Sequence, residues 1–264
     1  MTKEILSSIY DYTLDELKER LKPSFRAKQV YNWLYKKYAN SYDDMKNLPK
    51  ELIEDLKTNY PIDILKVVKK EQSRDGSIKY LFKLRDNHTI EAVLLLMKDK
   101  KIDEDGQIVR SEKYTVCISS QVGCKVGCSF CLTARGGFVR NLTVGEYIAQ
   151  IVHIKRDNEI AENKALNIVY MGMGEPLDNF DNFVKAVEIF SELDGLAISR
   201  RRQTVSTSGI ASKIKKLGEK DLQIQLAISL HAVDDELRSE LIPMNKAYNI
   251  ASIIDAVKEF PVDT

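Results

Sequence analysis

Hydrophobic positions along the first 60 residues recur at the spacing of amphipathic helices. The segment LDELKERL stops before Pro23, and FRAKQVYNWLYKKY places Val30, Leu34 and Tyr38 at four-residue intervals, as one face of a helix requires. A third segment, LPKELIEDLKTNY, has Pro49 near the expected start of a helix, where proline is tolerated. The pattern predicts a small helical domain over residues 1–60.

The pattern changes after this region. The turn sequence Arg74-Asp75-Gly76-Ser77 precedes IKYLFKL, and Asp86-Asn87 precedes TIEAVLLLM, which is rich in β-forming residues. A small antiparallel sheet accounts for both observations. The stretch KDKKIDEDGQ that follows is dominated by charged and polar residues, so residues 61–105 are predicted to form this sheet and a linker.

From residue 113 onward, apolar strands alternate with amphipathic helices. The predicted strands are YTVCIS, ALNIVYMGM, RQTVSTS and DLQIQLAISLH, and a helical segment follows each one. The first of these helices begins at Thr143, with Glu146 at capping-box spacing. Four such units predict an α/β fold over residues 106–264, with a parallel sheet buried on both faces. Four units are too few for the eight-unit barrel, which leaves an open sheet or part of a larger barrel.

Composition says more about the cellular location of the protein than about its binding partner. With 264 residues, 44% of them hydrophobic, the chain can bury one core and a small accessory domain. Its 40 basic and 39 acidic residues nearly cancel, so any nucleic-acid surface must be local. The sequence has no apolar stretch of roughly 18 residues and starts without a secretory signal pattern. We therefore expect a cytoplasmic protein with no membrane partner.

All four cysteines lie within fifteen residues, at positions 117, 124, 128 and 131. A disulfide framework would spread cysteines along a short secreted chain, whereas crowding indicates metal or redox chemistry. Cys124, Cys128 and Cys131 follow the first predicted parallel strand in the segment QVGCKVGCSFC. Three thiolates can hold three irons of a 4Fe–4S cluster and leave the fourth iron open to an external ligand.

Two other interpretations of the cysteines compete with this one. Cys117 could complete a structural zinc site, but it lies on a predicted strand and its spacing to Cys124 is unusual for zinc knuckles. The cysteines could also be inert and buried, although chance seldom produces three at this spacing. The cluster interpretation is therefore favoured.

The segment Cys-x3-Cys-x-aromatic-Cys after a first strand, with Phe130 as the aromatic residue, resembles the radical-SAM motif. Its surroundings resemble the RlmN/Cfr family of RNA methyltransferases in particular. Further matching segments are FRAKQVYNWLYKK, TIEAV, VYMGMGEPL, TVSTSG and ISLHAVDDELRSELIPMNKAYNI. The resemblance runs from about residue 20 to the last helix. It implies a partial radical-SAM (βα) barrel with an N-terminal helical domain and a small antiparallel β-sheet, with S-adenosylmethionine (SAM) as a cofactor beside the 4Fe–4S cluster.

The resemblance implies methylation of carbon 2 of an adenosine in 23S rRNA, and in certain tRNAs, through a methyl group carried on a cysteine. It also implies a flavodoxin-type electron donor and a monomer. The alternatives are a Cfr-like enzyme acting on carbon 8, another radical-SAM enzyme, or an inactive fragment that binds only cluster and RNA. Another radical-SAM enzyme would share the cysteines but not the FRAKQVYNWLYKK and TIEAV segments.

Candidate SAM-binding residues lie at the ends of the predicted parallel strands, where α/β sheets bind ligands. Gly174 would let the backbone approach the cofactor, and Glu175 can accept a hydrogen bond from its ammonium group. The alternative for this GMGEP segment is an ordinary turn between a strand and a helix, and an isolated Ser or His would more often be structural. The resemblance adds residues at the ends of the third and fourth strands: Ser206, Ser229, Leu230 and His231.

Two candidate catalytic residues come from the resemblance. Glu91 alone would be a solvated glutamate, but TIEAV aligns it with the family's proton-accepting glutamate, which must reach the substrate base. Cys117 alone would be a small buried hydrophobe. It resembles the family's second catalytic cysteine, which resolves a covalent protein–RNA adduct by disulfide formation.

RNA recognition requires local positive charge and aromatic surfaces. Each basic cluster alone could be a solvated face, and the resemblance favours the N-terminal domain for RNA binding. The candidates are Arg26, Lys28, Lys36 and Lys37 with Tyr31, Trp33 and Tyr35, and a second cluster at Arg200, Arg201 and Arg202.

The sequence departs from the family pattern in one respect. No cysteine follows Cys131, whereas the family's methyl-carrying cysteine and two further barrel strands lie downstream. The resemblance therefore predicts a fragment that cleaves SAM without methylating RNA until a segment with that cysteine is supplied.

Overall fold

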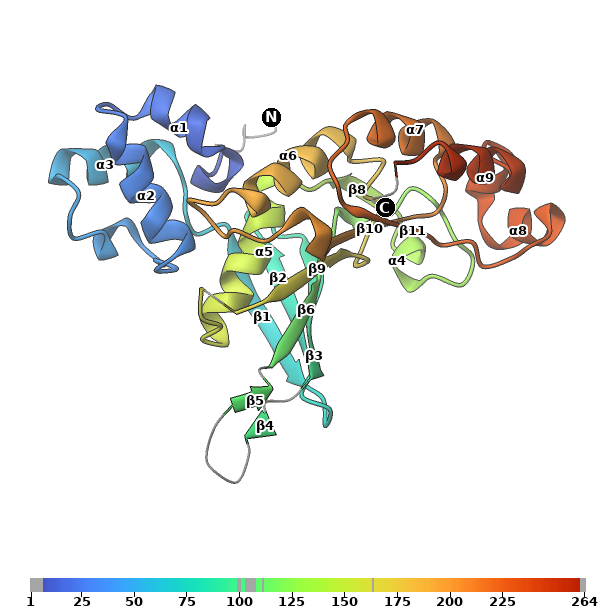
Figure 1. Cartoon of the computed structure of the whole chain (residues 1–264), viewed down its shortest axis with the longest axis horizontal. Helices are drawn as coiled ribbons and strands as arrows, with labels where there is room; N and C mark the ends of the chain where they lie inside the picture. Colours follow the sequence, from blue (N-terminus) through green and yellow to red (C-terminus); the bar gives the residue numbers. More distant parts are fainter. Residues whose placement is uncertain (1–6, 99–100, 103–107, 111, 163, 262–264) are drawn as a thin grey trace.

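The computed structural model describes residues 7–98, 101–102, 108–110, 112–162 and 164–261. Its N-terminal part is helical and lies at one end of the molecule (Figure 1), with 3-10 turns at Ile9–Asp11 and Tyr42–Asp44 and helices α1 (Leu14–Arg20), α2 (Phe25–Tyr35) and α3 (Lys50–Asn59). Val30 and Leu34 are fully buried on α2, as predicted. Tyr38 is not on that face: the helix ends at Tyr35, and Tyr38 has a positive φ of 52°.

One seven-stranded sheet forms the centre of the fold, in the order β1-β2-β3-β6-β9-β10-β11. The predicted antiparallel strands are present, and the four predicted parallel strands pair in sequence order. An antiparallel pairing of β3 with β6 joins the two groups, which the sequence did not predict. The bounds are β1 Leu65–Gln72, β2 Ile78–Leu84, β3 Thr89–Lys98, β6 Lys113–Cys117, β9 Leu166–Tyr170, β10 Gln203–Thr207 and β11 Gln225–Ile228.

The parallel strands bury one face far more than the other. On one face, Val116, Ile168 and Val205 are fully buried, and the ring of Tyr170 contacts Phe183 of α6 at 4.8 Å. Alternate residues on the other face are only half-buried. The prediction of equal burial on both faces is therefore wrong, because this is a partial barrel with an accessible inner face. The covering helices are α5 (Val144–Asp157), α6 (Phe180–Ser191), α7 (Ala211–Glu219) and α9 (Ile250–Lys258).

Several short elements were not predicted. A two-stranded sheet of β7 (Gln121–Gly123) and β8 (Phe138–Asn141) flanks the cysteines, with α4 (Leu132–Arg135) between them. Helix α8 (Asp235–Leu241) and 3-10 turns at Arg200–Arg202 and Pro243–Lys246 follow further along. The predicted linker contains β4 (Lys101–Ile102), and its antiparallel partner β5 (Ile108–Arg110) follows just after the linker. No helix in the described parts of the chain combines the length and apolar composition that crossing a membrane requires.

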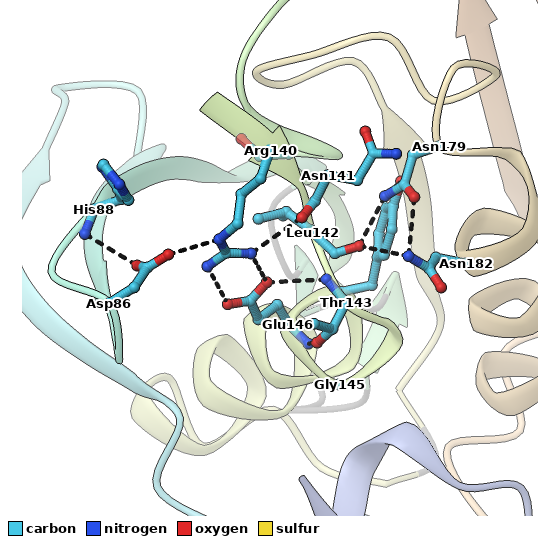
Figure 2. Close-up of polar contacts among 12 residues, drawn as sticks. Asp86, His88, Arg140, Asn141, Leu142, Thr143, Gly145, Glu146, Asn179 and Asn182 are labelled. Carbon is cyan, nitrogen blue, oxygen red and sulfur yellow. Dashed lines mark hydrogen bonds and ion pairs between the residues drawn. The ribbon is translucent and has the colours of Figure 1, made fainter. Parts of the chain in front are cut away.

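Arg140 on β8 connects distant parts of the chain at the start of α5 (Figure 2). Its Nε donates to the carboxylate of Asp86 in the β2–β3 turn at 2.6 Å, and its terminal nitrogens donate to both oxygens of Glu146 at 2.7 and 2.8 Å. The N–H of Gly145 donates to Asp11 of the N-terminal part at 2.6 Å. Strand β8, the β2–β3 turn and the N-terminal part are thus all held at the first turn of α5. The predicted capping box of α5 is present.

The charge balance at Asp86 depends on this arginine. Burial raises the pKa of Asp86, but the hydrogen bonds from Arg140 and from the N–H of His88, together with the positive charge of Arg140, outweigh burial and hold the pKa below its usual range. A carboxyl whose pKa is depressed in the folded state contributes stability above its unfolded pKa and loses it as the pH falls. The contribution of Asp86 is therefore present at neutral pH and is lost in acid.

We predict that Arg140→Met lowers the free energy of unfolding by about 2–3 kcal/mol at neutral pH, because Asp86 and Glu146 lose a charged partner in a partly buried position. Urea denaturation measures the loss, which should shrink as the pH falls through the Asp86 range. The matched control is Lys57→Met, which removes an exposed pair with Glu54 and should cost at most about 1 kcal/mol. Equal losses in the two variants would contradict the prediction.

Candidate functional site

The cysteine segment and the carboxyl ends of β9, β10 and β11 enclose a pocket of about 320 Å³. The pocket brings together the three predicted cluster ligands and most of the predicted SAM-binding residues. Its lining includes Cys124, Cys128, Phe130, Cys131, Gly174, Glu175, Ser206, Ser229 and His231. A larger cavity of about 970 Å³ along β11 is lined by Arg201 of the second basic cluster but by none of the predicted cluster-binding, SAM-binding or catalytic residues.

The cysteine loop is held by backbone hydrogen bonds on both sides. The N–H of Cys124 donates to the carbonyl of Gly137 at 3.1 Å, and that of Cys131 donates to the carbonyl of Cys128 at 3.1 Å. Burial raises the pKa of Cys124 to about 11 and also raises that of Cys128. Metal ligation requires thiolates, so binding at this loop must release protons.

The donor set fits an iron–sulfur cluster better than a single ion. All four cysteines are free thiols, and three of them line the pocket. No group of three or more His, Cys, Asp or Glu side chains is arranged to hold one metal ion in the residues that the structure describes. A cluster places each thiolate on a different iron, so its ligands are spread more widely than those of one ion. Three thiolates lining an open pocket match that requirement.

Glu175 is buried at the base of the pocket, with only 3% of its surface exposed. One carboxylate oxygen accepts hydrogen bonds from the N–H and Oγ of Ser208 at 2.8 and 2.9 Å, and the other accepts from the N–H of Leu177 at 3.1 Å. Burial raises the pKa of Glu175, while the bonds from Ser208 oppose that shift. Within the described residues, no basic side chain forms an ion pair with it, so a ligand ammonium group would find a buried, oriented anion.

Gly174 lines the pocket and also packs closely against the segment before the cysteines. Its φ is 104°, and a Cβ atom would lie 2.6 Å from the Oγ of Ser120 and from the Cβ of Gln121. The glycine is therefore required by packing against the segment before the cysteines, and the pocket forms on the other side of this contact.

The remaining rim residues come from β10 and β11. The hydroxyls of Ser206 and Ser229 lie 3.0 Å apart, and the His231 ring lies 4.7 Å from that of Phe130, with His231 at a φ of 60°. Leu230 does not line the pocket. Its carbonyl instead accepts a hydrogen bond from the Nε of Arg238 at 3.1 Å. Leu230 therefore contributes to the site through its backbone, which this bond holds in place.

Glu91 and Cys117 lie outside the pocket but share one face of the sheet. Cys117 pairs with Val93, so Glu91, two residues away on β3, is its diagonal neighbour on that face. Cys117 also pairs with Val169 of β9, two residues before the pocket residue Met171. Glu91 forms an ion pair with Lys79 at 2.7 Å, and burial raises the pKa of the Cys117 thiol. Both residues therefore lie on the accessible inner face below the pocket.

The predicted aromatic surface for RNA is largely wrong. Tyr31 and Tyr35 are buried in the core, so they cannot stack on bases. Trp33 is half-buried, with the Nζ of Lys37 3.9 Å from its ring centroid. The second basic cluster is accessible, since Arg201 and Arg202 are exposed.

Sequence reasoning missed two residues that support the site. Gln121 is fully buried and accepts a hydrogen bond from the N–H of Glu175 at 2.9 Å. Arg238 is also fully buried and lies behind the rim. Gln121 stands three residues before Cys124 in the motif, which is the signal that could have drawn attention to it.

We predict that Gly123→Ala abolishes most cluster uptake. Gly123 has a φ of 76°, and its Cβ would lie 1.8 Å from the carbonyl oxygen of Gly137, the same oxygen that accepts from Cys124. The control is Gly137→Ala, at a φ of 73° with no atom within 4 Å of the added Cβ. It should cost only about 1–2 kcal/mol of backbone strain. Iron and sulfide per chain after anaerobic reconstitution measure the difference, and equal contents would refute the prediction.

Comparisons with known proteins agree with this geometry. The family model described as Radical SAM superfamily matches residues 118–261, and that of the Ribosomal RNA large subunit methyltransferase N-terminal domain matches residues 9–62. The dual-specificity RNA methyltransferase RlmN of Aliarcobacter butzleri (strain RM4018) is 93% identical over the whole chain, which covers 73% of that protein. RlmN of Wolinella succinogenes is 65% identical over 97% of the chain and 72% of that protein.

A solved structure shows the same fold. The crystal structure of a radical SAM methyltransferase from Sphaerobacter thermophilus matches with a TM-score of 0.86 and 43% identity, covering 96% of this chain and 73% of that one. The α/β radical-SAM fold predicted from the sequence is therefore confirmed. By its identity to curated relatives along its whole length, the chain belongs to the RlmN family of the radical SAM superfamily.

Proposed function

We propose that this chain carries the SAM- and cluster-binding site of an RNA methyltransferase that modifies carbon 2 of an adenosine, in 23S rRNA and also in tRNA. The observation that carries the proposal is the single pocket in which three cysteines face Glu175 and the serines at the ends of β10 and β11. Family membership supports the same cofactor pair, a 4Fe–4S cluster and SAM.

Cys124, Cys128 and Cys131 are proposed to hold three irons, which leaves one iron without a protein ligand. When bound, the cluster and SAM supply the radical chemistry that a ring carbon resistant to ordinary methyl transfer requires. Glu175 would accept hydrogen bonds from the SAM ammonium group, since it is buried and already oriented by Ser208. The hydroxyls of Ser206 and Ser229, the ring of His231, and Gly174 would complete the pocket wall.

Two further roles rest on the inner face of the sheet. Glu91 is proposed to accept the proton from the methylated carbon, with Lys79 orienting its carboxylate through their ion pair. Cys117, a free thiol in this structure, is proposed to resolve the protein–RNA adduct: its thiolate would attack the sulfur of the methyl-carrying cysteine and form a transient disulfide, while the bond from that sulfur to the RNA-bound carbon breaks and that carbon takes up a proton. Because Glu91 and Cys117 are diagonal neighbours on one face of the sheet, both could reach the same substrate, which supports the two proposed roles.

The proposed partners follow from the same chemistry. We propose that RNA contacts the exposed Arg201 and Arg202 and the basic helices of the N-terminal part. Residues 1–60 would form this N-terminal RNA-binding domain. Residues 61–105 and 106–264 would form the antiparallel part and the radical-SAM part. A flavodoxin-type electron donor, a monomeric state and a cytoplasmic location complete the proposal.

Anaerobic incubation of the reconstituted protein with SAM and dithionite tests this function. The wild-type chain should release 5′-deoxyadenosine, and Cys128→Ala should release none, because one iron loses its ligand. Stoichiometric zinc without iron uptake, or no SAM cleavage by an iron-loaded protein, would contradict the proposal.

A second arm adds unmethylated 23S rRNA or tRNA, with the chain alone and with a segment bearing the family's methyl-carrying cysteine. Mass spectrometry of nucleosides should then detect 2-methyladenosine only when that segment is present. A methyl group on carbon 8 would indicate the Cfr-like activity.

A further inference from the structure

Arg238 of α8 is the largest fully buried side chain in the described part of the chain, with none of its surface exposed. Arginines are almost never fully buried unless they are paired, because removing the guanidinium from water is costly. Across the residues that the structure describes, no carboxylate forms an ion pair with Arg238. Asp235 interacts with it through charge without forming an ion pair, and Asn245 bridges the two side chains: its amide nitrogen donates to the Asp235 carboxylate at 2.9 Å.

Neutral oxygens satisfy the guanidinium instead. Its Nε donates to the carbonyl of Leu230 at 3.1 Å, and one terminal nitrogen donates to the Oδ1 of Asn245 at 2.5 Å and to the carbonyl of Tyr248 at 3.5 Å. The other terminal nitrogen donates to the carbonyl of Ser208. Two of these acceptors belong to the loops that follow β10 and β11.

These two loops form the rim of the pocket. Ser208 donates twice to the carboxylate of Glu175, so Arg238 stands one residue behind the buried anion of the site. Leu230 lies between Ser229 and His231, which both line the pocket. Arg238 itself does not line the pocket. It therefore acts on the pocket through the backbone of its rim.

Helix α8 also supports the cysteine loop. The N–H of Ser129, the residue after Cys128, donates to the carbonyl of Leu241 at the end of α8 at 2.9 Å. Ile242, the next residue along the chain, lines the pocket. One short helix thus contacts the cysteine loop at its end and both rim loops through Arg238.

We propose that Arg238 is the positioning residue of the SAM site: its fork of donors fixes the β10 and β11 loops relative to each other, and its positive charge, which forms no ion pair with a carboxylate among the described residues, is buried in the helix that supports the cysteine loop. The proposal rests on the proposed function, because it takes the pocket to be the SAM site. A guanidinium suits this task because its rigid, planar donors reach several carbonyls at once, which an ammonium group cannot do.

The two properties of Arg238 have separable consequences. Loss of the donor fork should loosen the rim and weaken SAM binding. Loss of the charge should make the reduction potential of the cluster more negative, because reduction adds a negative charge that a nearby buried cation stabilises. Arg238→Met removes both properties, whereas Arg238→Lys keeps the charge and removes the fork. Arg135→Met, in the exposed helix after Cys131, removes a charge that water already screens.

The experiment measures SAM affinity by anaerobic calorimetry and the cluster potential by a dithionite titration followed by electron paramagnetic resonance, after iron content and melting temperature have been matched. Arg238→Met should bind SAM about ten- to a hundredfold more weakly and have a more negative potential. Arg238→Lys should bind SAM more weakly but keep the wild-type reduction potential of the cluster. This variant still tests the role of the donor fork if the methionine variant does not fold. Arg135→Met should resemble the wild type in both measurements.

The outcomes separate this proposal from the proposed function. A wild-type protein that binds neither cluster nor SAM would contradict the function and remove the basis of the proposal. Wild-type affinity in folded, iron-loaded Arg238→Met or Arg238→Lys would overturn the role of Arg238 alone. An equal shift of potential in Arg135→Met and Arg238→Met would refute the special effect of the buried charge.

Discussion

The site depends on a close backbone contact between the end of β9 and the segment that leads from β6 to the cysteines. Gly172 and Gly174 pack against residues 118–121 with no space for a Cβ atom. Hydrogen bonds fasten the contact: the N–H of Gly172 donates to the carbonyl of Ile118 at 3.0 Å, and that of Ser120 donates to the carbonyl of Met173 at 2.8 Å. The contact sets Glu175 opposite Cys124 because both residues follow it directly in their own segments.

The asymmetric burial of the sheet explains where chemistry can occur. Helices α5 and α6 pack on the face that carries Tyr170, and this face supplies the core. The other face keeps polar and small residues half-accessible, among them Cys117, Thr204 and Ser206. Parallel pairing carries this face across four strands, so residues far apart in sequence align below one pocket. The proposed function therefore places the substrate against this polar inner face.

The sequence predicted the local elements well because periodicity is a local signal. The capping box at Thr143, the helices and the parallel strands all follow from neighbouring residues. The motif likewise identified three cysteines and Glu175, which the fold gathers in one pocket. The pairing of β3 with β6 could not be predicted, since strand partners are chosen by tertiary packing. Arg238 was missed for a related reason: within DELRSEL it has the sequence pattern of a solvated helix face, and only the loops around it make it buried.

The central claim is that the cysteine loop and the ends of the parallel strands form one site, in which the SAM amino group lies beside the iron that no cysteine holds. Electron–nuclear double resonance on the reduced protein with SAM labelled with ¹⁵N at its amino group tests this most directly. The account predicts a ¹⁵N coupling to the cluster, which gives way to a ¹⁴N pattern when unlabelled SAM replaces the labelled cofactor. A protein that binds both cluster and labelled SAM, yet shows no such coupling, would contradict the account.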